Sequence, residues 1–187
     1  EPQVKAALAA FQSSQKSSAD PLAAWLPSLE GGDPAQGAKV FESHPAAQCM
    51  RCHAGGYVGG DAGGDAGPDL SDIGLREDRR YFLESLTLPG AKVTMGYGIA
   101  SATLKGGKTV GGIVVDDKPS HVDFDSAGTI LRVKRADIAS MTPPVSSMPP
   151  MSYLLSASEI RDVIAWLSEQ KRKPQKKKSS PAPVMVT

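Results

Sequence analysis

The chain has 187 residues, of which 21 are Lys or Arg and 20 are Asp or Glu, so its formal net charge is +1. This length suits one domain with a sizeable core, and the near-zero charge gives no general case for nucleic-acid binding. No apolar run reaches the roughly 20 residues that span a bilayer, and two cysteines are too few for a disulfide-scaffolded fold. Because the chain starts at Glu1 without Met and shows no signal peptide, we expect a processed protein or a piece of a larger one.

The N-terminal residues, 1–30, form the first predicted unit, a helical or linker segment in which apolar residues recur at helical spacing. Asp33 and Pro34 then fit the N-cap and the first position of a second helix. That helix is expected to end near residues 43–45, shortly before the first cysteine.

The most informative segment is Cys49-Met50-Arg51-Cys52-His53, which has the C-x-x-C-H spacing of c-type haem attachment. Two thiols at this spacing reach the two vinyl groups of one porphyrin, and the histidine that follows is placed to ligate the iron. Three other interpretations of the two cysteines fit the sequence less well. A disulfide across this spacing closes a strained small ring, a thioredoxin-like pair lacks its βαβ context, and a zinc site needs two more ligands. We therefore expect one covalent haem c held by Cys49, Cys52 and His53.

The middle of the chain contains a glycine-rich segment and, after one helix, a β-rich segment. Residues 55–67 contain seven glycines, which predicts a loop, and residues 78–86 are expected to form a helix. Residues 97–137 hold short β-rich runs separated by turn residues, which predict three or four antiparallel strands. We expect these strands as a small insertion in a helical domain that spans residues 31–170.

A second iron ligand is sought among the methionines, because the soft thioether of Met favours ferrous iron. Met148 is followed by two prolines, which stiffen the loop that presents its sulfur. Met141 and Met151 are the alternatives, and His44 and His121 are weaker candidates. A methionine in a loop is otherwise ordinary packing.

The C-terminal region combines a helix with a basic tail. Ser156 and Glu159 predict a capping box at the start of the last helix, whose apolar stripe is flanked by Trp166. The tail, residues 171–187, places six basic and no acidic residues between 171 and 178, so the rest of the chain is acidic. With little to bury, the tail is expected to be disordered, and it either contacts an anionic surface or only keeps the protein soluble.

In their order along the chain, these motifs resemble those of class I c-type cytochromes. More narrowly, the chain resembles the haem-binding domain at the C-terminus of large secreted dehydrogenase-like proteins of planctomycetes and verrucomicrobia. The segments that carry the narrower resemblance are Leu29–Asp33, His44–Cys49, Gly67–Ser71, Tyr81–Ser85, Ser147–Pro149 and Glu159–Asp162. The resemblance implies that Gly37 and Phe41 meet Trp166 where the terminal helices cross.

The resemblance also implies a fold and a ligand set. The fold would be mainly α, a cytochrome c fold around one haem, with a small antiparallel β insertion. Pro68 would pack on the ring of His53, and its carbonyl would accept a hydrogen bond from the second imidazole nitrogen. Met148 would be the distal iron ligand.

The function expected from these features is that of a monohaem c-type cytochrome that transfers single electrons and is not itself an enzyme. Its partner would be a redox protein or a fused dehydrogenase domain, with no nucleic acid and no transmembrane segment. Arg76, Arg79 and Arg80 are candidates to pair with the haem propionates. The alternative is a haem enzyme or gas sensor with an open distal site. Since haem c is attached outside the cytoplasm, we expect a periplasmic or exported location.

Overall fold

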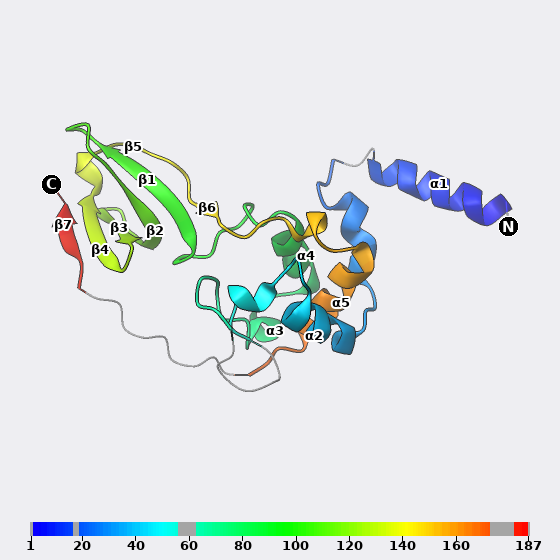
Figure 1. Cartoon of the computed structure of the whole chain (residues 1–187). Coiled ribbons are helices and arrows are strands. Elements are labelled where there is room, and N and C mark those ends of the chain that lie inside the picture. The colour runs from blue at the N-terminus through cyan, green and yellow to red at the C-terminus, as the bar shows by residue number, and fades with distance from the viewer. Residues whose placement is uncertain (1, 17–18, 56–62, 173–181, 187) are drawn as a thin grey trace.

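The computed structural model describes residues 2–16, 19–55, 63–172 and 182–186. These residues form a helical part and a seven-stranded sheet, which lie side by side (Figure 1). Each part has its own apolar core. Among the described residues, two connecting segments run between the parts, one before β1 (Gly98–Leu104) and one after β5 (Ile138–Met141).

The N-terminal segment is helical, as the sequence predicts, but its two helices differ in their surroundings. The first, α1 (Pro2–Lys16), projects away from both parts (Figure 1), and its Val4 is 69% exposed. The second, the 3₁₀ helix η1 (Ala23–Leu29), packs against the helical core. None of the described helices is long and apolar enough to cross a membrane.

The remaining helical elements begin where local capping residues allow. They are α2 (Pro34–Ser43), α3 (Ile73–Arg76), α4 (Arg79–Thr87) and α5 (Ala157–Ser168), with the 3₁₀ helices η2 (Cys49–Arg51) and η4 (Met151–Tyr153). The Asp33 carboxylate accepts hydrogen bonds from the first free backbone N–H groups of α2. Ser156 and Glu159 form the reciprocal capping box of α5. Both predicted N-termini are confirmed.

The crossing of α2 and α5 organises the helical core. The rings of Phe41 and Trp166 stack with their centroids 4.4 Å apart, and both side chains are buried. A Cβ atom at Gly37 would lie 2.0 Å from the carbonyl oxygen of Asp162, so only glycine permits this approach. The expected meeting of Gly37 and Phe41 with Trp166 is confirmed.

The sheet has the strand order β5-β1-β2-β3-β4-β7, with β6 paired to β1. Its strands are β1 (Gly98–Leu104), β2 (Thr109–Asp117), β3 (His121–Ser126), β4 (Thr129–Lys134), β5 (Ile138–Met141), β6 (Val145–Ser146) and β7 (Val184–Val186). All pairs are antiparallel except β4 with β7, so the sheet is mixed. Val122, Phe124 and Val133 are fully buried in its core.

The expected fold class is wrong. A mainly α cytochrome c fold with a small antiparallel insertion does not describe this chain, because a seven-stranded mixed sheet with its own core stands beside the helices. Four strands fall within the predicted insertion of residues 97–137. The others follow it: β5 ends at Met141, β6 lies between Met141 and Met148, and β7 lies near the C-terminus.

The C-terminal tail also differs from the prediction. Val184 and Val186 pair in parallel with Leu131 and Val133 of β4, and Val186 is buried. The end of the segment expected to be disordered is thus a strand. Most of the basic run lies in residues 173–181, outside the described residues.

Candidate functional site

One short helical turn positions the two cysteines and the histidine. Gln48 has a left-handed backbone, with φ of 45°, and turns the chain into η2. The backbone N–H groups of Cys52 and His53 then donate to the carbonyl oxygen of Cys49, at 3.1 and 3.0 Å. Both cysteines are free thiols, Cys49 partly buried and Cys52 exposed.

These three residues line a cavity in the helical part. The cavity has a volume of about 210 Å³ for water-sized molecules and opens to solvent. Most of its wall is apolar and includes Leu70, Ile73, Phe82, Leu86, Pro89, Val93, Met148, Pro149, Met151 and Leu167. The wall therefore suits an apolar ligand that meets a few polar groups.

The imidazole of His53 is held by the backbone of Pro68. Its Nδ1 lies 2.9 Å from the Pro68 carbonyl oxygen. Because a carbonyl only accepts hydrogen bonds, Nδ1 carries the proton and Nε2 keeps its lone pair. Burial lowers the pKa of His53, although the bond to Pro68 opposes this shift, so the ring is neutral at pH 7. The expected contact between His53 and Pro68 is present, and it leaves Nε2 able to ligate a metal.

The described end of the glycine-rich segment packs against this motif. Residues 56–62 of the predicted loop lie outside the described residues. The backbone N–H of Gly64 donates to the carbonyl of Met50 at 2.9 Å, and that of Gly67 to the carbonyl of Cys52 at 2.7 Å. A Cβ atom at Gly67 would lie 2.6 Å from Cε1 of His53. Glycine at position 67 therefore lets the chain pass directly against the imidazole.

The two thiols have different environments. Burial raises the pKa of Cys49 to about 11, whereas Cys52 is exposed. Cys49 is therefore a protonated thiol at neutral pH, and it is a weak nucleophile in the folded chain. Reaction at Cys49 needs either a very reactive electrophile or a locally open chain.

The three methionine candidates lie in different places in the structure. Met148 and Met151 both line the cavity, but Met151 is buried in the helical core at 4% exposure. Met141 ends β5 and packs against the core of the sheet. Neither His44 nor His121 is among the described residues that line the cavity. His44 Nδ1 instead accepts from backbone N–H groups just after α2.

Of the three arginines predicted to face propionates, only Arg76 lines the cavity. Arg79 donates to the backbone carbonyls of Leu29 and Gly31, and so ties α4 to the preceding loop. Arg80 pairs with Asp20 at 2.8 Å. A second cation at the cavity, Lys92, was not predicted.

Part of the cavity wall gave no sequence signal. The connecting segments supply Lys92, Val93, Thr94 and Tyr97 from one side and residues 146–149 from the other. Only Met148 and its prolines carried a recognisable pattern. The rest acquire their position from the way in which the sheet is joined to the helices.

No protein-family model matches the chain, and no curated protein matches it.

Proposed function

We propose that this chain binds one haem c through thioether bonds from Cys49 and Cys52, with His53 as an axial ligand, and transfers single electrons. One observation carries the proposal. One mostly apolar cavity is lined by both thiols, by a histidine with an available Nε2 and by a methionine sulfur donor, Met148.

The donor set fits a haem c. The turn of η2 sets Cys49 and Cys52 one helical turn apart with His53 next to them, as attachment to two vinyl groups of one ring requires. The Pro68 carbonyl fixes the tautomer and orientation of His53 and raises the basicity of Nε2. Burial keeps the imidazole neutral, which is the state that binds iron.

Met148 is the distal ligand in this proposal. It lies in the segment that closes one side of the cavity, and its backbone N–H donates to Ser146 Oγ at 3.1 Å. Met151 is less suited, because its side chain fills the helical core. When bound, the haem supplies a one-electron ferric–ferrous couple, and a thioether ligand favours the ferrous state.

The other side chains of the cavity either exclude water from the ligand or carry positive charge. The apolar wall shields the ligand, which raises the cost of the ferric charge. Arg76 and Lys92 supply positive charge at the cavity and are suited to meet the two propionates, although each also has an acidic neighbour, Asp72 and Glu84.

The proposed partner is a redox protein or a dehydrogenase module fused to this chain. The chain itself acts as an electron carrier rather than as an enzyme. Because covalent attachment of haem takes place outside the cytoplasm, a periplasmic or exported location belongs to the same proposal.

The distal ligand is tested by absorption spectroscopy of protein expressed with a haem-maturation system. Met148→Ala is expected to remove the methionine–iron charge-transfer band of the ferric protein. The matched control Met141→Ala, which alters the sheet core instead, leaves that band unchanged. If Met148→Ala retains the band, Met148 is not the ligand, and loss in Met151→Leu would assign it to Met151. A wild-type protein with haem but no such band would support the open-site alternative.

A further inference from the structure

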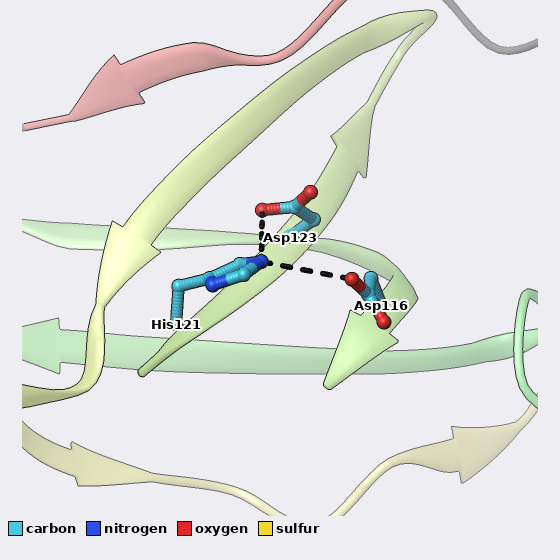
Figure 2. A group of neighbouring side chains, drawn as sticks. All are labelled: Asp116, His121 and Asp123. Atoms are coloured by element: carbon cyan, nitrogen blue, oxygen red, sulfur yellow. Dashed lines mark ion pairs between the residues drawn. The ribbon is translucent and has the colours of Figure 1, made fainter. Parts of the chain in front are cut away.

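Three side chains with metal-binding groups converge in the sheet, at the turn between β2 and β3 (Figure 2). His121 Nε2 lies 3.6 Å from Asp116 Oδ2 and 3.9 Å from Asp123 Oδ1. One donor atom from each residue lies within 4.8 Å of the others. These residues belong to the sheet and not to the wall of the haem cavity, so the inference does not rest on the proposed function.

An irregularity in β2 brings Asp116 into this group. Val114 pairs with Phe124, but Asp116 pairs with Asp123, so Val115 is an extra residue between the two pairs. In a regular ladder Asp116 would oppose Val122 and face the other side of the sheet. The bulge moves its carboxylate to the face of Asp123, as bulges next to functional sites do.

The group contains one buried polar atom without a hydrogen-bond partner. His121 Nε2 is fully buried and has no hydrogen-bond partner, and it is the one such side-chain atom found in the part of the chain that the structure describes. Both carboxylate oxygens near it lie beyond hydrogen-bond distance. Two carboxylates directly opposite one another on neighbouring strands also repel. A cation among the three groups would remove both costs.

The surrounding groups orient the three donors. Arg132 donates to both oxygens of Asp123, at 2.8 and 2.7 Å, and these two bonds fix the orientation of the carboxylate. Lys118 pairs with the other oxygen of Asp116 at 3.2 Å. Ser120 Oγ lies 2.9 Å from His121 Nδ1. A hydroxyl that accepts from Nδ1 leaves the Nε2 lone pair facing the carboxylates, which suits a metal ligand.

We propose that Asp116, His121 and Asp123 form a zinc site that joins β2 to β3, with water as the fourth ligand. Zinc bonds of about 2.0–2.2 Å in a tetrahedral arrangement set neighbouring donors about 3.4 Å apart, close to the separations of 3.6 and 3.9 Å. The imidazole nitrogen favours zinc over calcium and magnesium, which take oxygen ligands. Each carboxylate oxygen has a second lone pair, so Asp123 can bind zinc while it accepts from Arg132.

The test is a calorimetric titration of the full chain with zinc chloride, after prolonged treatment with iodoacetamide has blocked any cysteine that carries no haem, Cys49 included, as checked by mass spectrometry. The wild-type chain is expected to bind one zinc ion per molecule at the sheet, and His121→Ala and Asp116→Asn each to weaken that binding at least tenfold. Asp117→Asn is the matched control, because Asp117 opposes Val122 and pairs with Arg135 instead. Its affinity for zinc should equal that of the wild type.

Two results would overturn the proposal. One is a wild-type chain that binds no zinc. The other is unchanged zinc affinity in the variants. If His121→Ala fails to fold by circular dichroism, Asp116→Asn decides alone, because its side chain is 36% exposed and leaves the buried pair of Asp123 with Arg132 intact. Zinc binding without covalent haem would refute the proposed function and keep this site.

Discussion

Replacing Gly67 with alanine puts a methyl group against the imidazole of His53. The new Cβ would lie 2.6, 2.7 and 3.0 Å from Cε1, Nδ1 and Nε2 of the ring, whereas ordinary contact begins at 3.4 Å. The ring must therefore move by about 0.8 Å at its nearest atom, or the backbone must move instead. Overpacking of this kind costs about 1–3 kcal/mol. It also strains the 2.9 Å hydrogen bond to Pro68, whose net contribution is about 1 kcal/mol.

The assay is urea unfolding of wild type and variant, together with the absorption spectrum of the haem-loaded protein. We expect Gly67→Ala to lower the free energy of unfolding by about 1–3 kcal/mol and to alter the spectrum, because His53, the proposed iron ligand, is displaced. Gly90→Ala is the matched control, since a Cβ there meets nothing within 4 Å. It also reports the effect that alanine has on the unfolded chain. A Gly67→Ala protein that matches Gly90→Ala in both stability and spectrum would refute the reasoning.

Three further predictions concern the helices and the thiols. Phe41→Ala removes a buried ring stacked on Trp166 and should cost about 3–5 kcal/mol in urea unfolding; a loss below about 1 kcal/mol would contradict the packing. Ser156→Ala deletes the N-cap of α5 and should cost about 1 kcal/mol in the same assay; an unchanged free energy of unfolding would argue against the cap. In the folded haem-free chain, Cys49 should react with iodoacetamide far more slowly than Cys52 at pH 8, because burial raises its pKa to about 11, and equal rates measured by mass spectrometry would contradict this. The pKa of Cys49 is higher in the folded chain than in the unfolded chain. The thiol therefore contributes fully to the free energy of unfolding at a pH below the unfolded pKa, and this contribution is lost as the pH rises toward 11.

Local features of the fold were predictable where a few adjacent residues determine them. Asp33 and the pair Ser156 and Glu159 mark helix starts through hydrogen bonds to backbone within three residues. Gly37 and Trp166 were predictable as a contact only through the resemblance to a known family, because nothing local indicates that two segments so far apart in sequence cross.

The fold class was wrong because the strands outside the predicted insertion depend on distant partners. β6 has two residues and exists by pairing with β1, and β7 exists by pairing with β4 more than 50 positions earlier in the chain. A Val-Met-Val segment at the end of a basic tail has no local signal that separates it from coil. The bulge at Val115 is equally invisible, so the side chains that it brings together in the sheet could not be grouped from the sequence.

The reactive residues of the candidate cavity could be predicted from the sequence, but the shape of its wall could not. The spacing of Cys49, Cys52 and His53 is set by the chemistry of the ligand they would bind, and the Pro68 contact followed from the resemblance. The wall formed by Val93, Tyr97 and their neighbours depends on the path of the connecting segments between the helices and the sheet.

The mass of the denatured protein shows whether a haem is covalently attached to the chain. The chain is expressed in the periplasm of a host with haem-maturation machinery, unfolded in acid and measured by mass spectrometry. We predict the mass of the polypeptide plus one haem, and its loss when Cys49 and Cys52 are both replaced by serine. A mass equal to that of the bare polypeptide, from cells in which a control c-type cytochrome acquires its haem, would contradict the account.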